Sequence, residues 1–354
     1  MPLAASQGGA EAVRTMKKTT KKSYHVALVG VGAVGVEMLR VLRQRRFPMA
    51  SLRVLATRPR QETIDGKAYQ VEKATPESFK GVDLALFAGG EEPEGHLGWP
   101  AVEAGAVVVD NGPVYRLYPN VPLVVPEVNP HVLEGDARLI ANPNCSTIQL
   151  VVVLKPLYDH ARIKRVVVST YQSVSGKGSA AKTQLAKEWK HAAAGDPPPK
   201  ETCFTRPIAD NVIPHIDRFS ADGYTLEETK LLHETRKIMG DDHLQVTATA
   251  VRVPVMNGHS ESVNIEFYSP LSAEEARKLL RAAPGVKVQD DPGHNSYPVP
   301  FEVSGTDEVY VGRIRQDRSV PYGINLWIVA DNIRKGAALN AVQIAEKMAE
   351  LGKL

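Results

Sequence analysis

The chain has 354 residues, of which 43% are hydrophobic and 23% charged, and its formal net charge is +3. This length allows two domains with large cores, and the composition is ordinary for a globular protein. The small net charge gives no reason to expect a nucleic-acid partner. Two cysteines form neither a disulfide framework nor a cysteine-rich zinc site. No apolar run reaches the roughly 18 residues that a membrane span needs. We therefore expect a cytoplasmic protein with no metal centre and no membrane or nucleic-acid partner.

Residues 1–22 differ in composition from the rest of the chain. Residues 1–12 are mainly small or polar, and the run from Met16 to Lys22 is basic. The segment lacks the apolar core of about 7–15 residues that a secretory signal needs. We expect residues 1–22 to be a disordered leader, with Met16 as an alternative start.

The first predicted unit is a β-α-β arrangement with a glycine-rich turn. Strands are predicted at Tyr24–Val29 and Ser51–Ala56, with a helix at Val36–Leu42 whose apolar residues share one face. The turn between the first strand and the helix is a GxGxxG motif, made of Gly30, Val31, Gly32, Ala33, Val34 and Gly35. Its glycines allow a tight turn, close approach of a pyrophosphate, and close helix packing. The motif predicts a dinucleotide-binding domain; a glycine-rich turn in another α/β domain is the alternative.

The residues after the second strand bear on the choice of cofactor. An NAD site usually has Asp or Glu there for the ribose hydroxyls, whereas this chain has Thr57, Arg58 and Arg60. A guanidinium group binds phosphate through paired, charge-assisted hydrogen bonds. Thr57 and Arg58 therefore favour NADP over NAD, unless the two arginines are ordinary solvated loop charges.

The predicted parallel sheet continues with strands at residues 82–88, 106–109 and 138–141. The loops after parallel strands meet at the carboxyl edge of the sheet, where ligands bind in this fold. Gly89, which follows the first of these strands, is therefore a candidate cofactor contact. The last strand leads into the loop that holds Cys145, so this candidate nucleophile should lie at the same edge.

The loop around Cys145 precedes an apolar run. Asn144 or Ser146 can cap a helix that begins here, and Pro156 should end it. The positive end of that helix should stabilise a thiolate, which is the nucleophilic form of cysteine. The alternative is a buried and unreactive cysteine.

The remaining sequence predicts a second domain of the α+β kind. Strands are predicted at residues 165–174, 245–255, 260–268, 308–315 and 323–329, and helices at 180–194 and 226–239. Long strands with few intervening helices favour a mixed or antiparallel sheet. We place the first domain at residues 23–144, completed by a returning C-terminal segment at 331–354, and the second at 145–330.

Several separated segments carry a resemblance to a known family. They are residues 124–129 (VVPEVN), 143–147 (PNCST), 169–176 (STYQSVSG), 252–255 (RVPV), 259–262 (HSES) and 331–338 (DNIRKGAA). In one register from about Tyr24 to the C-terminus, the chain closely resembles aspartate-semialdehyde dehydrogenases of the bacterial type. The resemblance implies an α/β fold, with an N-terminal Rossmann-type NADP-binding domain and an α+β catalytic and dimerisation domain that forms a homodimer.

The same resemblance implies an activity, the reductive dephosphorylation of L-aspartyl 4-phosphate to L-aspartate 4-semialdehyde with NADPH. This step feeds the synthesis of lysine, methionine, threonine and diaminopimelate. Cys145 would be the nucleophile, forming an acyl thioester as phosphate leaves. His259 would be the general acid/base, because an imidazole titrates near neutrality. Gln172 would orient the acyl group.

The resemblance also implies binding residues. The substrate would be held by polar and charged side chains, namely Arg116, Asn144, Gln172, Glu227, Lys230 and Arg252. Within this set, Arg252 would bind the α-carboxylate and Glu227 the α-amino group, while Arg116 and Lys230 would hold the acyl phosphate. Ser175, Gly176 and Asn332 would approach the cofactor.

Taken singly, these residues have plainer interpretations. His259 could be a core or surface histidine, Arg252 a structural ion pair, and Glu227 with Lys230 a pair on a helix surface. Cys203 has no motif around it and is expected to be structural. The phosphate loop is one residue shorter than the GxTGxxG form usual in the family, so a threonine hydroxyl contact is not expected, although backbone N–H groups can still meet the pyrophosphate.

Two other functions are kept as alternatives. One is an enzyme like N-acetyl-γ-glutamyl-phosphate reductase, whose cysteine loop typically has His-Pro-Gly-Cys where this chain has Asn-Pro-Asn-Cys. The other is a non-catalytic relative of the same fold. The joint presence of Cys145, Gln172, Arg252 and His259 favours an enzyme.

Overall fold

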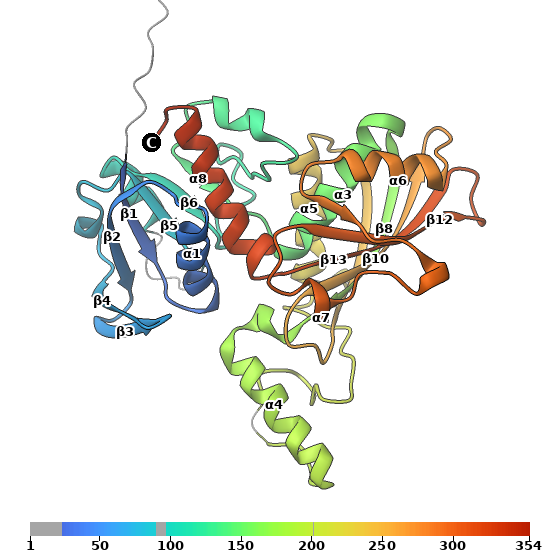
Figure 1. The fold of residues 1–354 in the computed structure, drawn as a ribbon, viewed down its shortest axis with the longest axis horizontal. Helices are drawn as coiled ribbons and strands as arrows, with labels where there is room; N and C mark the ends of the chain where they lie inside the picture. Colours follow the sequence, from blue (N-terminus) through green and yellow to red (C-terminus); the bar gives the residue numbers. More distant parts are fainter. Residues whose placement is uncertain (1–22, 90–96, 201) are drawn as a thin grey trace, which may run out of the picture.

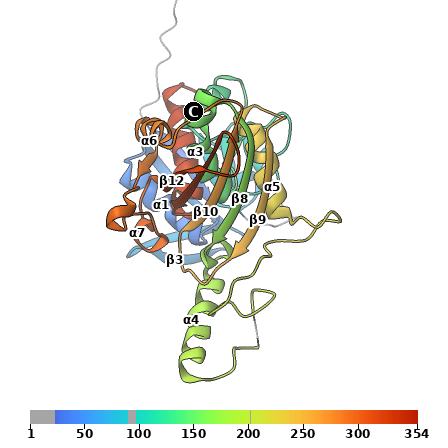
Figure 2. The same ribbon diagram turned by 90° about the vertical axis from the view of Figure 1, so that its right-hand side faces the viewer.

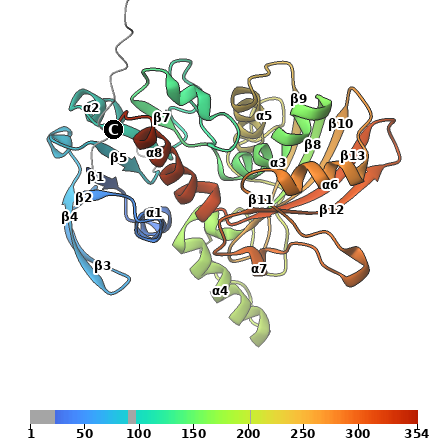
Figure 3. The ribbon, with the colours of Figure 1, turned by 45° about the horizontal axis from the view of Figure 1, so that its top comes forward.

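The computed structural model describes residues 23–89, 97–200 and 202–354, so the leader predicted at 1–22 lies outside the described residues. Two β-sheets lie side by side, each with its own helices (Figure 1). The first is built from the N-terminal part of the chain and the second from the later part, and the C-terminal helix α8 (Asn340–Glu350) lies on the side of the first sheet (Figures 1 and 3).

The first sheet has the order β3-β4-β2-β1-β5-β6-β7. Its strands are β1 (Tyr24–Val29), β2 (Met49–Ala56), β3 (Arg60–Ile64), β4 (Lys67–Lys73), β5 (Leu84–Phe87), β6 (Val107–Asp110) and β7 (Leu139–Ala141). All neighbouring pairs are parallel except β3 with β4. Helix α1 (Ala33–Gln44) follows β1, and α2 (Gly98–Glu103) precedes β6. The predicted Rossmann-type sheet is confirmed.

The β3-β4 hairpin was not predicted. Its strands are largely exposed and polar, so they lack the apolar pattern that marks a strand in a sequence. Its turn places Asp65 and Gly66 at positive φ, +51° and +74°. The Asp65 carboxylate pairs with Arg40 of α1 at 2.6 Å, which ties the hairpin to the helix of the glycine-rich turn.

The second sheet is mixed, as predicted, with the order β11-β12-β13-β10-β8-β9. Its strands are β8 (Ile163–Gln172), β9 (Gln245–Arg252), β10 (His259–Phe267), β11 (Val286–Val288), β12 (Val309–Asp317) and β13 (Gly323–Ala330). Its apolar face packs in one core with α3 (Cys145–Ala161), α5 (Leu226–Met239) and α6 (Ala273–Ala282). Helix α4 (Ser179–Ala194) projects away from both sheets (Figures 1 and 2), and α7 (Pro300–Val303) is a short helix before β12.

The prediction that Pro156 ends the helix after Cys145 was wrong. Helix α3 continues to Ala161 with Pro156 inside it. A proline within a helix removes one backbone hydrogen bond and costs about 3 kcal/mol. Leu157 and Ala161, beyond the proline, are buried in the core. Because burying a leucine contributes roughly 1.5–3 kcal/mol, packing of the last turn offsets much of the cost of the proline.

The C-terminal segment joins the two halves. It begins with a π-helix, η5 (Arg334–Leu339), and continues as α8, whose apolar side chains share a core with β1, β5 and β6. Lys335 is 1% exposed and donates to Glu127, Asn340 and Gln343 at 2.7–3.1 Å. These bonds fix η5, a conformation frequent at functional sites, in contact with both α1 and α3.

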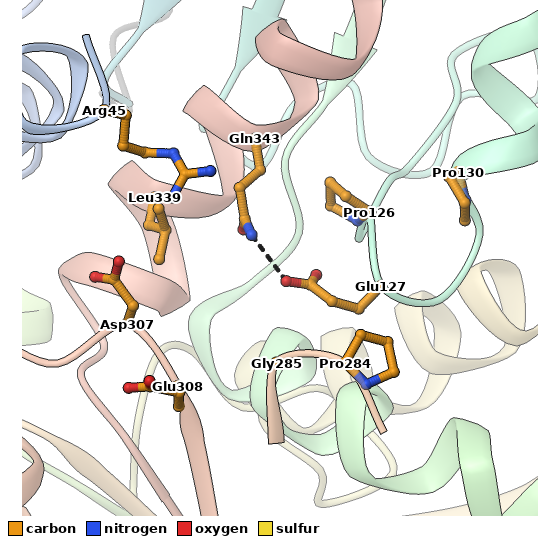
Figure 4. Close-up of a pocket in the computed structure, with 10 residues that line it drawn as sticks. All are labelled: Arg45, Pro126, Glu127, Pro130, Pro284, Gly285, Asp307, Glu308, Leu339 and Gln343. Carbon is orange, nitrogen blue, oxygen red and sulfur yellow. Dashed lines mark hydrogen bonds between the residues drawn. The ribbon is translucent and has the colours of Figure 1, made fainter. Parts of the chain in front are cut away.

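A surface pocket lies beside this junction (Figure 4). It is lined by Arg45, Pro126, Glu127, Pro130, Pro284, Gly285, Asp307, Glu308, Leu339 and Gln343. Several of its polar groups bond to other residues of the chain, since Glu127 pairs with Lys335 and Arg45 with Glu346. None of the predicted site residues lines it. Within the described ranges, no helix is long and apolar enough to cross a membrane, and no cluster of His, Cys, Asp and Glu is arranged to hold a metal ion.

Candidate active site

The glycine-rich turn has the shape that a dinucleotide requires. Gly30 has a φ of +97°, which strongly favours glycine. A Cβ on Gly35 would lie 2.0 Å from the Gly30 carbonyl oxygen, so only glycine allows α1 to pack this close. A Cβ on Gly32 would meet nothing within 4 Å, which leaves open space in front of the first turn of α1. The open helix start, with no side-chain cap, fits a pyrophosphate.

The other members of the motif support the turn. Val31 and Val34 pack against the core that includes α8, and Ala33 is exposed at the start of α1. At the neighbouring strand end, Gly89 has a φ of +93° and backs onto Asn111. The carboxyl ends of β1 and β5 thus form one edge for the cofactor.

Thr57 and Arg58 are exposed just beyond the end of β2. In the part of the chain that the structure describes, no side-chain partner is recorded for Arg58. Arg60 differs, because its Nε donates to Glu62 at 2.7 Å. Of these two arginines, Arg58 is therefore the one whose guanidinium has no side-chain partner among the described residues.

Cys145 is the first residue of α3, and of the two predicted candidates, Asn144 and Ser146, it is Asn144 that caps the helix. The Asn144 side-chain oxygen accepts hydrogen bonds from the N–H groups of Ser146 at 3.0 Å and Thr147 at 3.3 Å. Gly336 of η5 packs directly behind the cysteine, since a Cβ on that glycine would lie 3.0 Å from the Cys145 Cβ. The nucleophile candidate is thus held between the helix start and the π-helix.

Glu227 is the centre of a buried polar network beside Cys145. Its Oε1 accepts from Asn144 Nδ2 at 2.9 Å and from Gln172 Nε2 at 3.1 Å, and its Oε2 accepts from Lys230 Nζ at 3.2 Å. Burial alone would raise the pKa of Glu227, but the Lys230 charge and these hydrogen bonds hold it below its ordinary value. Glu227 is therefore a carboxylate, and it aligns Gln172 with the cysteine turn.

His259 begins β10 and is fully buried. Its Nδ1 accepts the Ser173 backbone N–H at 3.1 Å, so a neutral imidazole carries its proton on Nε2. Nε2 lies 3.4 Å from Gln172 Nε2 at the end of β8. The Gln172 NH₂ group is itself a donor and donates to Glu227, so the two groups do not hydrogen-bond in this tautomer, and the ring is held through Nδ1.

The protonation states differ from those expected from the sequence. Burial first and the Glu227 charge second raise the pKa of the Cys145 thiol to about 12, although the residue is only half-buried. The predicted helix effect is present, since the Ser146 N–H lowers this pKa, but it is smaller. Burial and the neighbouring Arg252 charge lower the pKa of His259 to about 3, so the expectation of titration near neutrality was wrong. Without substrate, thiol and imidazole are both neutral.

Three cationic side chains surround the network. Arg116 is buried, with its Nη1 3.1 Å from Glu234 and its Nη2 donating to the Asn111 carbonyl oxygen at 2.9 Å. Lys230 lies 2.9 Å from Asp217 as well as beside Glu227. Arg252, at the end of β9, donates through Nη1 to the Ser173 carbonyl oxygen at 2.6 Å. Arg116 and Lys230 are thus paired with carboxylates, whereas Arg252 donates to a neutral carbonyl oxygen.

The candidate cofactor residues of the second half lie around the imidazole. A Cβ on Gly176 would lie 3.3 Å from Arg252 Nη1 and 3.4 Å from the His259 ring, so a side chain there would fill the site. Asn332 is buried, and its Oδ1 accepts from Ser175 Oγ at 3.1 Å and from the Gly258 N–H at 2.9 Å. In this structure the Asn332 side chain links the loops around His259 and does not face a cavity that a cofactor could enter.

Some residues of the site were missed from the sequence. Glu234 lies one turn beyond Lys230 on α5, at a helical spacing that could have revealed it. Ser173 and Glu261 stand inside segments that carried the family resemblance, but nothing in their local sequence signalled a role. Cys203 lies apart from the site, against the small core beside α4.

Comparisons with known proteins identify the family of the chain. The family model described as "Semialdehyde dehydrogenase, NAD binding domain" matches residues 25–135, and "Semialdehyde dehydrogenase, dimerisation domain" matches residues 154–335. The aspartate-semialdehyde dehydrogenase of Aquifex aeolicus is 52% identical over 337 residues, which are 93% of this chain and 99% of the relative.

Solved structures give the same result. Aspartate semialdehyde dehydrogenase II from Vibrio cholerae, complexed with ASA, has a TM-score of 0.87 and 43% identity, with 93% of this chain and 99% of that chain covered. The enzyme with NADP from Candida albicans has a TM-score of 0.71 and 26% identity, with 94% and 100% covered. The chain therefore belongs to the aspartate-semialdehyde dehydrogenase family.

Proposed function

We propose that this protein catalyses the NADPH-dependent reductive dephosphorylation of L-aspartyl 4-phosphate to L-aspartate 4-semialdehyde, through an acyl thioester on Cys145. One observation carries the proposal. A single buried network joins the Cys145 turn, Gln172 and Glu227, with His259 and three cations beside it. These groups come from the start of α3, from β8, α5, β9 and β10, and from the loop after β6 that carries Arg116, so their meeting is a property of the fold and not of one motif.

The substrate has groups that match the site. Arg252 would bind the α-carboxylate through its forked guanidinium, and Glu227 would accept from the α-ammonium group. Arg116 and Lys230 would hold the acyl phosphate, with Asn144 lining the same space. Arg116 is well suited, because its Nε is buried and has no hydrogen-bond partner among the described residues. A buried donor of this kind is costly unless a ligand accepts from it.

In the first step the Cys145 sulfur forms a bond to the acyl carbon, and the bond from that carbon to the phosphate oxygen breaks. The thiol proton leaves with phosphate as hydrogenphosphate, so charge and atoms balance. NADPH, when bound at the glycine-rich turn, would supply the hydride that reduces the thioester carbonyl. His259 would donate a hydrogen bond from Nε2 to the developing oxygen anion, and a proton from solvent would complete the thiohemiacetal. The thiohemiacetal then collapses to the aldehyde as its hydroxyl proton returns to the Cys145 sulfur. Because Nδ1 accepts the Ser173 N–H, the neutral ring has an N–H and not a lone pair at Nε2, which supports a donor role over the base part of the general acid/base role that the resemblance implies.

NADP is the proposed cofactor because Arg58 stands at the end of β2 without a side-chain partner in the described ranges, while Glu62 engages Arg60. Gly30, Gly32 and Gly35 would hold the pyrophosphate, and Gly89 and Gly176 would let the cofactor approach the two strand edges. By this activity the protein would serve lysine, methionine, threonine and diaminopimelate synthesis.

A homodimer is proposed as the working form. The face of the second sheet opposite α3 carries a ring contact between Tyr171 and Trp327, with centroids 5.3 Å apart, and Tyr171 is exposed. This face belongs to the region that matches the dimerisation-domain model. Sedimentation equilibrium should give twice the chain mass, and a monomer at micromolar concentration would contradict this part of the proposal.

The assay that tests the activity follows the reverse reaction. L-aspartate 4-semialdehyde, NADP and inorganic phosphate should give an increase in NADPH absorbance that depends on phosphate. N-acetyl-glutamate 5-semialdehyde serves as the competing substrate. A higher kcat/KM with that aldehyde would favour the alternative reductase, and no turnover of either aldehyde would favour a non-catalytic relative.

A further inference from the structure

Glu234 on α5 contacts two parts of the candidate phosphate site at once. Its side chain is 1% exposed. Oε2 accepts the Asn144 backbone N–H at 2.6 Å, immediately before the nucleophile Cys145, and Oε1 accepts from Arg116 Nη1 at 3.1 Å. One rigid carboxylate therefore links the cysteine turn to the guanidinium proposed to bind phosphate.

The loop that carries Arg116 is held by the same helix. Lys237, three residues beyond Glu234, donates through Nζ to the carbonyl oxygens of Arg116, Tyr118 and Val121, each at 2.8 Å. With Nη1 on Glu234 and Nη2 on a backbone carbonyl, the guanidinium has a fixed orientation. Its buried Nε is the group left without a partner in the described part of the chain, so a polar donor remains for a ligand.

A purely structural ion pair would explain why Glu234 contacts Arg116. It would not explain why the same carboxylate also accepts the Asn144 N–H. The reaction needs the acyl carbon within about 3–3.5 Å of the sulfur while the phosphate rests on Arg116. A carboxylate bound to both partners sets that separation. A glutamate that served stability alone would have no effect on phosphate affinity beyond any general loosening of α5.

We infer that Glu234 is a positioning residue that holds Arg116 in register with Cys145 and thereby sets the affinity of the site for phosphate. The inference rests on the proposed function, because it takes phosphate as the group bound at Arg116. It assigns no contact between Glu234 and the substrate.

The test is Glu234→Gln in the full-length protein. A glutamine oxygen can still accept the Asn144 N–H, but its NH₂ group then faces the Arg116 guanidinium, so the alignment is lost. Inorganic phosphate binding is measured by calorimetry in the presence of NADP, which needs no turnover. We expect phosphate affinity about tenfold lower and, in the reverse assay, a KM for phosphate raised by a similar factor. The KM for the semialdehyde should stay within about twofold, since its binding groups are untouched.

The matched control is Glu228→Gln. Glu228 is a buried glutamate on the same helix that accepts from the N–H groups of Thr225 and Ala250 and does not contact the site. This variant should bind phosphate as wild type does. Equal losses in the two variants, or unchanged or tighter phosphate binding by Glu234→Gln, would overturn the inference.

A second variant covers a Glu234→Gln protein that does not fold. Lys237→Met frees the loop of Arg116 without touching the carboxylate, and we expect a smaller loss of phosphate affinity in the same direction. Wild-type affinity in this variant overturns the inference, as does a wild-type protein that binds no phosphate. Wild type that binds phosphate but turns over no aldehyde contradicts the proposed function and leaves the calorimetric comparison valid.

Discussion

The cofactor edge of the first sheet and the cysteine site beside the second sheet are built in different ways. The glycine-rich turn is made of backbone, has an open helix start, and is shaped by Gly30 and Gly35. The cysteine site is made of buried side chains that are hydrogen-bonded to one another, with Glu227 at its centre. The glycine-rich turn can accept a dinucleotide through the shape of its backbone. The cysteine site instead requires particular charged side chains at particular positions.

The difference predicts how each region fails. A backbone site is sensitive to added volume and tolerant of changes in charge. A buried side-chain network is sensitive to a lost partner, because each donor or acceptor left behind costs about 1–3 kcal/mol. Substitutions in the two regions should therefore separate cofactor binding from chemistry.

The largest expected effect is that of Cys145→Ser. A serine hydroxyl is a far weaker nucleophile than a thiol and forms an ester that accepts hydride less readily than a thioester. We expect kcat to fall by about 1,000-fold or more while NADP affinity is kept, because the cofactor edge is untouched. Stopped-flow assay of the reverse reaction and calorimetry with NADP measure the two quantities. Activity near that of wild type would contradict the thioester mechanism.

Gly35→Ala tests the backbone region. The new methyl group would lie 2.0 Å from the Gly30 carbonyl oxygen, so α1 must move away from the turn. We expect a loss of about 1–3 kcal/mol in unfolding free energy, with weaker NADP binding. Gly32→Ala is the matched control, since its methyl group meets no protein atom within 4 Å. It should leave urea unfolding unchanged and affect cofactor binding alone. Equal stability of the two variants would contradict the packing argument.

The same contrast explains how much the sequence could predict. The GxGxxG turn, the cap of α3 and the extent of α5 depend on neighbours in the chain. The turn and the extent of α5 were predicted, and Asn144 was one of the two candidate caps. Glu234 meets Asn144 across 90 positions of sequence, so only the fold brings them together. The directions of the Cys145 and His259 pKa values depend on burial, which a motif does not report. The prediction that Pro156 ends α3 was wrong because the local sequence pattern does not show that the residues beyond the proline pack into the core.

Arg58→Ala tests the one side chain on which cofactor choice is proposed to depend. Loss of a charge-assisted contact to phosphate should raise the KM for NADP about tenfold and leave the KM for NAD unchanged. Arg60→Ala is the control, because Glu62 already engages that guanidinium at 2.7 Å. Steady-state kinetics with both cofactors measure the effect. A larger rise in the KM for NADP in the Arg60 variant would show that Arg60, and not Arg58, determines cofactor choice.

Glu261→Gln is expected to have the smallest effect on catalysis, and its pH-dependent stability tests how well the core beside the cysteine site excludes water. Glu261 lies on β10 two residues after His259 and is fully buried, and neither carboxyl oxygen has a hydrogen-bond partner among the described residues. Burial raises the pKa of Glu261 well above its ordinary value, and the nearby Gln149 amide, which lies outside hydrogen-bonding geometry, lowers it only in part. The folded protein therefore holds a proton that the unfolded chain releases.

Because the folded-state pKa of Glu261 is the higher one, its contribution to stability is complete below the ordinary glutamate range and is lost as pH rises towards the folded-state value. Wild-type unfolding free energy should fall relative to that of Glu261→Gln by up to about 1.4 kcal/mol per pH unit above pH 5. A neutral glutamine has no proton to lose, so the two curves should diverge with pH. Urea unfolding of both proteins between pH 6 and pH 9 measures the divergence. Parallel plots of unfolding free energy against pH would mean that water or a moving side chain reaches Glu261. The core beside the cysteine site would then be more open to solvent than its hydrogen bonds imply.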